Sequence, residues 1–319
     1  MSKLCIFNPE HDICLANGNR NFVPPQMALR FARNAYWVMR ILYGDEVVAV
    51  SSEDAPNAIN LQVEEIIPWG WDLALRQFLI RKGIPQELVP TEEEIAVIRT
   101  LQHRTTGMDI HKQLLETMGC EGLASAAEFA ISVEDALRLL KAEGSVIFKA
   151  PLSGSGQGLR PVRDQLTHHD EGWIRNLCNS QGGVMVERRY QVVQDFALEY
   201  IMSDSLQFEG YSWFETQGGA YTANLLIGDE EIRRRLASYI DLAFFDAVRS
   251  ALESILEETI KGRYKGPLGV DMFVYRDGDG FGLNPLVEIN FRHTMGLVAH
   301  RLLQRQPWRE GEKFSVHPI

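Results

Sequence analysis

The sequence lacks an excess of basic residues. Its 319 residues include 32 Lys and Arg against 43 Asp and Glu, which gives a formal net charge of −11. Non-specific binding to nucleic acid requires a basic surface, so this balance predicts that the protein has no nucleic-acid partner. It remains compatible with a local basic pocket for a phosphorylated small molecule.

Cysteine and long apolar runs are also scarce. The four cysteines are scattered, with no C-x-x-C pair and no histidine at metal-ligand spacing, which is typical of a reducing compartment. No apolar run approaches the length of a membrane span. The first residues, MSKLCIF, lead into a strand-like segment without the layout of a signal peptide. We therefore expect a cytoplasmic protein with no membrane partner.

The N-terminal part has the pattern of a small α/β unit. Apolar runs at 3–7 and 47–50 predict strands, and an apolar stripe over 26–42 predicts one helix between them. This order favours parallel strands, whose carboxyl ends bind ligands, so the polar loop 8–21 is a candidate substrate loop. The residues that would line it are Glu10, His11, Asp12, Asn19 and Arg20. The alternative is that these side chains only cap turns.

Longer helices follow. Thr91-x-x-Glu94 is a capping box before a helical pattern, and a second helix is expected over 109–118. Ser132 is placed to cap a third helix, which should stop at Gly144. The pattern predicts that helices separate the N-terminal unit from the strands that come next.

The stretch 269–296 carries the strongest chemical signal. Two segments with strand-like alternation, 270–275 and 286–291, are joined by DGDGFG, a turn whose Asp and Gly residues tolerate positive φ. The pattern predicts a hairpin. The residues of its second strand that should point into a core are Val287, Ile289 and Phe291.

The other face of this hairpin is a candidate metal site. Residues two apart share a face of a strand, so Glu288 and Asn290 point together, and simple pairing adds Asp271 to them. Two carboxylates and an amide oxygen are the hard ligands that Mg²⁺ prefers. The alternative is an ordinary solvent-facing strand.

A glycine-rich loop forms the second chemical element. A short strand at 146–148 ends in Lys149 and is followed by SGSGQG, residues 153–158. Such a loop lets backbone N–H groups approach phosphate oxygens, and the lysine adds a point charge. The spacing fits neither a Walker A motif nor a Rossmann fingerprint. Further apolar strands are expected at 184–186, before Glu187, and at 196–202.

These elements, in this order, resemble the ATP-grasp superfamily, in particular its D-alanine–D-alanine ligase-like carboxylate–amine ligases. The resemblance rests on Lys149 with SGSGQG, VMVE ending at Glu187, LGVD ending at Asp271, and EIN followed by Arg292. It covers about residues 94–299 and implies an α/β fold of the α+β grasp type. The implied order is a small N-terminal parallel α/β domain, residues 1–94, and an ATP-grasp domain, residues 95–319, with a lid subdomain at about 122–187.

The resemblance also implies roles for individual residues. Lys149 would contact the α- and β-phosphates, Glu187 the adenine edge and Asp195 the ribose hydroxyls, with Arg104 reaching the phosphates from before the lid. The lid loop would include Ser153, Gly154, Ser155, Gly156 and Gly158. The Mg²⁺ ligands would be Asp271, Glu288 and Asn290, and the catalytic residues Arg292 and Lys149.

The implied activity is an ATP- and Mg²⁺-dependent ligation of a small-molecule carboxylate to an amine through an acylphosphate, with Mn²⁺ as a substitute metal. Two alternatives stay open: a kinase acting on a small molecule, and a regulatory or degenerate nucleotide-binding protein. The nucleotide-binding alternative rests on a difference from the pattern of the family. Where relatives commonly carry a Lys or Arg toward the γ-phosphate, residues 208–228 contain none. The nearby candidates are Arg233, Arg234 and Arg235, or else these form a solvated charge run on a helix. A homodimer is a further expectation.

Overall fold

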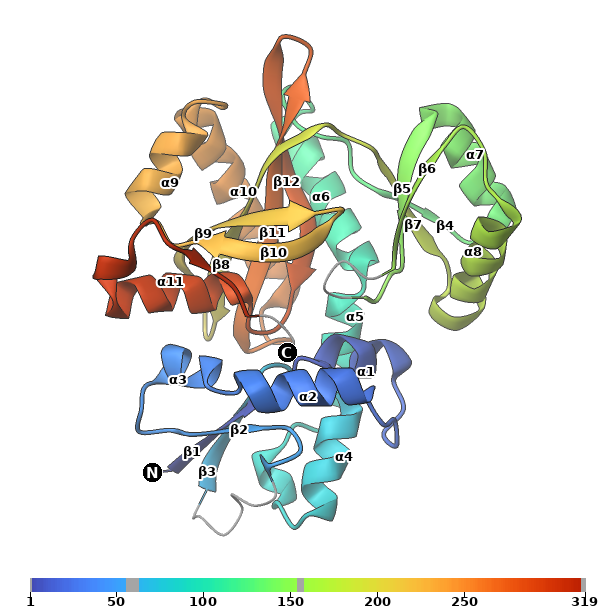
Figure 1. The fold of residues 1–319 in the computed structure, drawn as a ribbon. Coiled ribbons are helices and arrows are strands. Elements are labelled where there is room, and N and C mark those ends of the chain that lie inside the picture. The colour runs from blue at the N-terminus through green and yellow to red at the C-terminus, as the bar shows by residue number, and fades with distance from the viewer. Residues whose placement is uncertain (1, 56–62, 154–157, 317–319) are drawn as a thin grey trace.

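The computed structural model describes residues 2–55, 63–153 and 158–316, and these form three β-sheets flanked by helices (Figure 1). A parallel sheet occupies the N-terminal part, a four-stranded antiparallel sheet the middle, and a six-stranded antiparallel sheet the C-terminal part. The predicted α/β class of grasp type is confirmed. The predicted domain limits at residues 94 and 122–187 stay a proposal.

The N-terminal sheet has the order β2-β1-β3, with both neighbours parallel to β1, as the alternation of strand and helix predicts. Its strands are β1 Ser2–Phe7, β2 Val48–Ser51 and β3 Val63–Pro68. The helices around it are α1 His11–Asn17, α2 Gln26–Ala35, α3 Val38–Tyr43, α4 Leu73–Arg81 and the 3₁₀ turn η2 Gln86–Leu88. Strand β3 was not predicted from the sequence.

Two predictions for this part are wrong. The single helix expected over 26–42 is broken into α2 and α3. At the break the N–H groups of Met39 and Arg40 donate to carbonyls three residues back, and the Trp37 indole donates to the Asn34 carbonyl. The loop 8–21 contains the short helix α1, which ends where Gly18 adopts φ 69° and its N–H reaches the Cys14 carbonyl.

The middle sheet has the order β4-β7-β5-β6, and one face is covered by two helices. In Figure 1 these helices lie on the outer side, and the sheet turns its other face toward the rest of the molecule. Its strands are β4 Glu128–Ala130, β5 Ser145–Lys149, β6 Leu159–Arg163 and β7 Val184–Arg188. Its helices are α7 Val133–Glu143, capped by Ser132 as predicted, and α8 His168–Gln181.

The large sheet has the order β12-β11-β8-β9-β10-β13. Its strands are β8 Val192–Met202, β9 Leu206–Gln217, β10 Ala220–Leu225, β11 Gly266–Asp277, β12 Gly280–Asn290 and β13 Lys313–Phe314. The surrounding helices are α5 Glu92–Gln102, α6 Arg104–Met118, α9 Asp229–Leu236, α10 Leu242–Ile260, α11 Met295–Arg305 and the turn η3 Pro307–Arg309. The predicted β11–β12 hairpin is confirmed.

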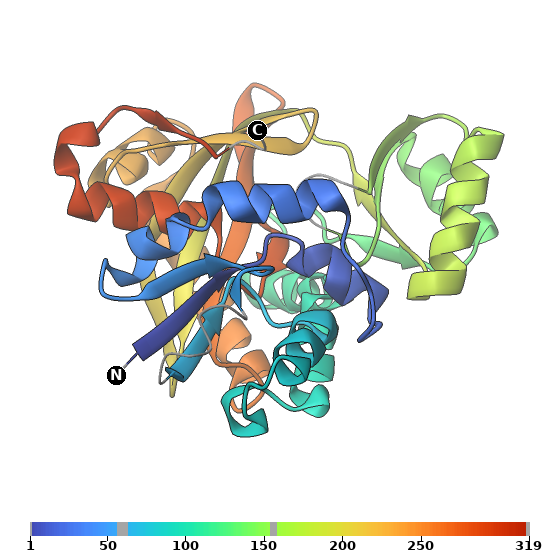
Figure 2. The same ribbon diagram turned by 60° about the horizontal axis from the view of Figure 1, so that its bottom comes forward.

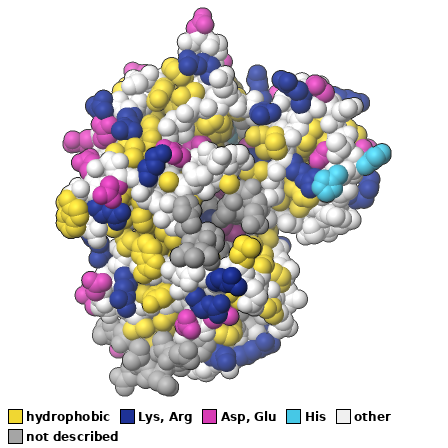
Figure 3. All heavy atoms as spheres, viewed as in Figure 1, with side chains coloured by type: hydrophobic (Ala, Val, Ile, Leu, Met, Phe, Trp, Pro, Cys, Tyr) yellow, Lys and Arg dark blue, Asp and Glu magenta, His cyan; other side chains and the backbone are white. Residues whose placement is uncertain are grey.

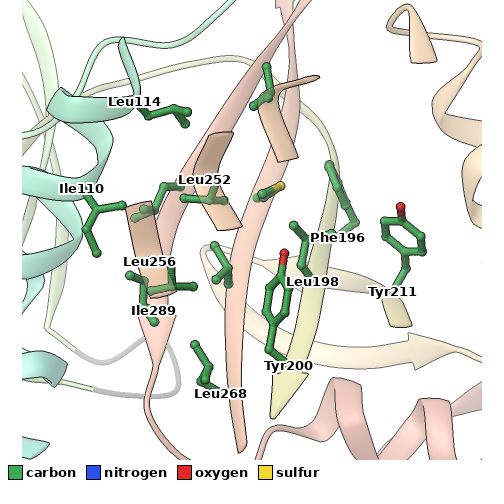
Figure 4. Close-up of a cluster of buried hydrophobic side chains, with 14 of the residues drawn as sticks. Ile110, Leu114, Phe196, Leu198, Tyr200, Tyr211, Leu252, Leu256, Leu268 and Ile289 are labelled. Atoms are coloured by element: carbon green, nitrogen blue, oxygen red, sulfur yellow. The ribbon is translucent and has the colours of Figure 1, made fainter. Parts of the chain in front are cut away.

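The two faces of the large sheet differ in chemistry. One face packs its apolar side chains against α6 and α10 in the main hydrophobic core, part of which Figure 4 shows. Ile289 and Phe291 lie in this core as predicted. Val287 does not: a register shift between Asp271 and Phe273 displaces it, and it packs with Phe273 in a smaller cluster.

The N-terminal sheet is joined to the large sheet through α11. Phe7 and Trp69 share a buried apolar cluster with Leu302 of α11, and the backbone N–H of His293 donates to the Trp69 carbonyl at 3.0 Å. Figure 2 brings this junction forward. None of the helices in the described ranges is long and apolar enough to span a membrane. On the face in Figure 3, basic and acidic side chains are interspersed.

Candidate active site

The β11–β12 hairpin brings the predicted metal ligands together. Asp271 and Glu288 are direct cross-strand partners, and the Asn290 amide donates to the Asp271 carboxylate at 3.1 Å. Burial, and then repulsion from Glu288, raise the pKa of Asp271 to about 7. Two carboxylates held this close are stabilised by a cation between them.

The donor set fits Mg²⁺ by its chemistry, because it consists of two carboxylates and an amide oxygen on a rigid hairpin. In the described ranges, this hairpin included, no group of three or more His, Cys, Asp and Glu side chains is arranged to hold a metal ion. The predicted set contains only two such residues, with the Asn290 side chain as the third oxygen donor. It therefore stays a candidate site.

The acidic face continues onto strand β8. Ala197 pairs with Asp271, and Glu199 and Asp195 flank it at two-residue spacing, so all three lie on the face opposite the core. Asp195 accepts a hydrogen bond from the Thr216 hydroxyl at 2.8 Å, and burial raises its pKa. Asp195, the predicted ribose-binding residue, thus lies on the same face of the sheet as the predicted metal ligands. It is two residues before Ala197, the partner of Asp271.

The middle sheet contributes the predicted phosphate-binding lysine. Lys149 ends β5, and its ammonium lies 2.5 Å from the carboxylate of Glu187 on the neighbouring strand β7. Both side chains are nearly buried, so each charge depends on the other for compensation. The structure therefore brings the predicted phosphate and adenine residues together as one ion pair.

Arg104 links the two sheets. Its backbone N–H and its Nε donate to the carbonyls of Pro151 and Ala150, next to β5, at 3.0 and 3.1 Å. Its Nη2 lies 2.9 Å from a carboxylate oxygen of Glu288. The sequence pattern began the helix at 109, whereas α6 begins at Arg104 itself, and this start aims the side chain at the hairpin.

The glycine-rich loop is described only at its ends. The Ala150 N–H donates to the Gly158 carbonyl at 2.9 Å, and Gly158 has φ 74°, which favours glycine. The Ser153 hydroxyl lies 3.5 Å from the Ala150 carbonyl. The other predicted loop residues, Gly154, Ser155 and Gly156, lie outside the described residues.

Arg292 follows the hairpin and is held by the N-terminal part. Its Nε and Nη2 each donate at 2.9 Å to the Asp12 carboxylate, and Nη1 donates to the His293 carbonyl at 3.0 Å. Burial alone would raise the pKa of Asp12, but the Arg292 guanidinium outweighs it and the pKa is lowered. Of the five guanidinium N–H donors, these bonds use three, which leaves two without a hydrogen-bond partner in the described part of the chain.

The candidate loop 8–21 contributes only in part. Asp12 reaches the site, whereas Arg20 pairs with Glu92 on the surface at 2.8 Å. Glu10 and His11 are buried beside Asp72 at the carboxyl end of the parallel sheet. Asn19 accepts a hydrogen bond from the Asn21 backbone, as in an ordinary turn.

Sequence reasoning missed Glu199. This carboxylate is 1% exposed and accepts hydrogen bonds from Thr294 at 2.6 Å and Ser212 at 3.1 Å, while burial raises its pKa to about 7. Thr294 also caps α11, so Glu199 fixes the segment that carries Arg292. The available signal was a single charged residue inside the apolar strand FALEYIM.

A cleft lies between these elements. Its walls come from the start of α6, from β7 and the residues around it, and from the edge strand β12. The charged residues that line it are Arg104, Glu187 and Glu288. The cleft thus places one cation and two carboxylates beside an apolar recess.

The sequence matches no protein-family model and no curated protein. The structure resembles an N5-carboxyaminoimidazole synthetase from Staphylococcus aureus complexed with ADP, with TM-score 0.51 and 14% identity over 95% of this chain and 76% of that one. It also resembles a biotin carboxylase from Campylobacter jejuni, described as a β,γ-ATP complex, with TM-score 0.50 and 15% identity over 98% of this chain and 72% of that one. The chain therefore has the ATP-grasp fold.

Proposed function

We propose that this protein is an ATP-dependent ligase that joins a small-molecule carboxylate to an amine through an acylphosphate. The observation that carries the proposal is the cross-strand pair Asp271–Glu288, with Arg104 beside it and the Lys149–Glu187 pair on the facing sheet. The two solved structures of similar fold are a synthetase with ADP and a carboxylase with an ATP complex, which supports a nucleotide in this cleft.

The proposed reaction has two steps. A carboxylate oxygen attacks the γ-phosphorus of ATP, the bond to the leaving oxygen breaks, and ADP departs. The amine nitrogen then attacks the acyl carbon, the bond to phosphate breaks, and the nitrogen loses a proton. Neither step requires a covalent bond to the protein, so positioning and charge compensation are the protein's contribution.

The chain's residues supply these contributions. Lys149 and Arg104 would bind phosphate oxygens, and the two open N–H donors of Arg292 would neutralise the transferring phosphoryl group. Asp271, Glu288 and Asn290 would hold the metal. Mg²⁺, or Mn²⁺ in its place, would supply positive charge that offsets the charge of the phosphates.

The test is ADP release in the presence of paired carboxylates and amines, with mass spectrometry of the products. The proposal predicts ADP formation that requires both substrates and a product with one new amide bond. Glu288→Gln should abolish turnover while the protein stays folded. ADP formation with a phosphorylated alcohol and no amide would favour the kinase instead.

A second candidate is a nucleotide-binding protein without turnover. It is favoured by the absence of Lys and Arg from 208–228 in the sequence, and by the pairing of the nearby arginines with acidic residues. Arg233 binds Asp246 at 2.6 and 2.8 Å, and Arg234 and Arg235 both bind Glu231 at 2.7 Å on helix α9. This candidate predicts ATP binding with no ADP release for any substrate pair.

A further inference from the structure

Helix α6 forms one wall of the cleft. Four of its residues line the opening: Arg104, Gly107, Met108 and His111. Spacings of three, four and seven residues place them on one helix face. Arg104 and His111 are two turns apart, about 10 Å along the axis at 1.5 Å per residue. The wall therefore has a charged end, where Arg104 forms an ion pair with Glu288, and an opposite end at His111.

His111 is the unusual residue of this wall. Its side chain is 2% exposed, and its Nε2 is buried with no hydrogen-bond partner in the described part of the chain. Other polar side chains of the cleft do have partners in the protein, including Gln102, His103, Arg104, Ser125, Glu187 and Tyr190. A buried polar atom left unpaired destabilises the protein, so this nitrogen requires an explanation.

The surroundings of His111 indicate what it would bind. Burial lowers its pKa to about 4 against the opposing charge of Glu187, so the imidazole is neutral near pH 7. The apolar side chains that line the cleft are Leu101, Met108, Met185, Leu286, Val287 and Ile289. A neutral hydrogen-bonding nitrogen among apolar side chains suits a flat uncharged heterocycle and disfavours a phosphate.

We propose that His111 Nε2 hydrogen-bonds the base of the bound nucleotide. The inference rests on the proposed nucleotide site and gives the nucleotide a direction in it. The phosphates lie at the Arg104 end and the purine ring at the His111 end, a separation that an extended nucleoside triphosphate spans. A base bound there would supply the hydrogen-bond partner that Nε2 lacks.

The test compares His111→Leu with the unchanged protein in calorimetric titrations of Mg-ATP and of Mg-tripolyphosphate, which has no base. We expect ATP to bind about tenfold more weakly to the variant, the loss of one neutral hydrogen bond. Tripolyphosphate should bind equally well to both. The ligand-free variant should be as stable as the parent or more so, because an unpaired buried polar group has been replaced by an apolar one.

Two matched variants sharpen the test. His111→Gln carries an amide that reaches the place of Nε2, and it should regain most of the ATP affinity. Gln113→Leu makes a polar-to-apolar change on the exposed side of the same helix, away from the cleft, and it should bind ATP as the parent does. If the parent binds ATP and His111→Leu binds it equally tightly, the inference is overturned and the proposed function stands. A parallel loss of tripolyphosphate binding would also overturn it, while a parent that binds no ATP would overturn the proposed function.

Discussion

Arg292 and Asp12 lie 280 residues apart in the sequence and are joined by two hydrogen bonds of 2.9 Å. Their side chains are only 13% and 10% exposed, so neither charge is well solvated without the other. The pair fixes the proposed phosphoryl-binding arginine against helix α1. The N-terminal part of the chain is therefore a structural component of the candidate active site.

Replacement of Asp12 by Asn should leave the buried Arg292 charge uncompensated. We expect the free energy of unfolding to fall by about 2 kcal/mol, because breaking a largely buried ion pair strands the remaining charge. Urea denaturation measures this. Arg20→Gln is the control, since it breaks the exposed Arg20–Glu92 pair and should cost less than about 1 kcal/mol. Equal stability losses in the two variants would contradict the account.

Lys149→Met should weaken nucleotide binding whether or not Mg²⁺ is present, because the role proposed for Lys149 is a direct phosphate contact. The expected loss is about 10- to 100-fold, the equivalent of one charge-assisted hydrogen bond. Lys112→Met removes an exposed lysine that pairs with Glu128, and it should bind ATP normally. Unchanged ATP affinity in a folded Lys149→Met protein would remove this residue from the site.

The metal-free protein should lose stability as the pH rises. The pKa of Asp271 is about 7 in the folded state against an ordinary value near 4, so the protonated form is favoured by folding. Its contribution is fully present below about pH 4 and is lost as the pH rises through about 7. Asp271→Asn cannot ionise, and in EDTA it should gain stability relative to the parent between pH 5 and pH 8. An identical pH dependence in both proteins would count against the assignment.

The same pKa predicts how metal binding responds to pH. A protonated Asp271 must release its proton before it can act as a ligand. Mg²⁺ affinity should therefore rise about tenfold per pH unit up to about pH 7 and level off above it. Titration of Mg²⁺ in the presence of ATP between pH 5.5 and 8.5 measures the slope.

Gly296→Ala should disturb the segment that carries Arg292. A Cβ at this position would overlap the carboxylate of Glu199 and the hydroxyl of Ser212. We expect a loss of about 1–3 kcal/mol in the free energy of unfolding, as for other overpacked sites. Gly172→Ala on helix α8 is the control, because its Cβ would meet nothing within 4 Å. This control should be neutral or gain up to about 1 kcal/mol from helix propensity.

Local patterns predicted the parts of the site that local structure determines. The β11–β12 hairpin follows from alternation and a turn sequence, and with it comes the pairing of Asp271 with Glu288. The Thr91–Glu94 capping box and the strand end at Lys149 were equally accessible, because each depends on neighbouring residues.

Contacts between distant segments could not be predicted from the sequence. The position of Arg104 depends on where α6 begins and on the packing of that helix against β12. The sequence around Glu199 does not predict its hydrogen bonds with Thr294 and Ser212. Val287 was misplaced because the register shift in the hairpin depends on a bulge, which alternation does not reveal.

The central claim is that Mg-ATP binds in the cleft through the Asp271–Glu288 hairpin. The most direct measurement is calorimetric titration of ATP, with and without Mg²⁺, into the parent protein and Glu288→Gln. The account predicts that Mg²⁺ tightens ATP binding in the parent and that this gain is largely lost in the variant, while binding of metal-free ATP changes little. A variant that binds Mg-ATP as tightly as the parent, at unchanged stability, would contradict it.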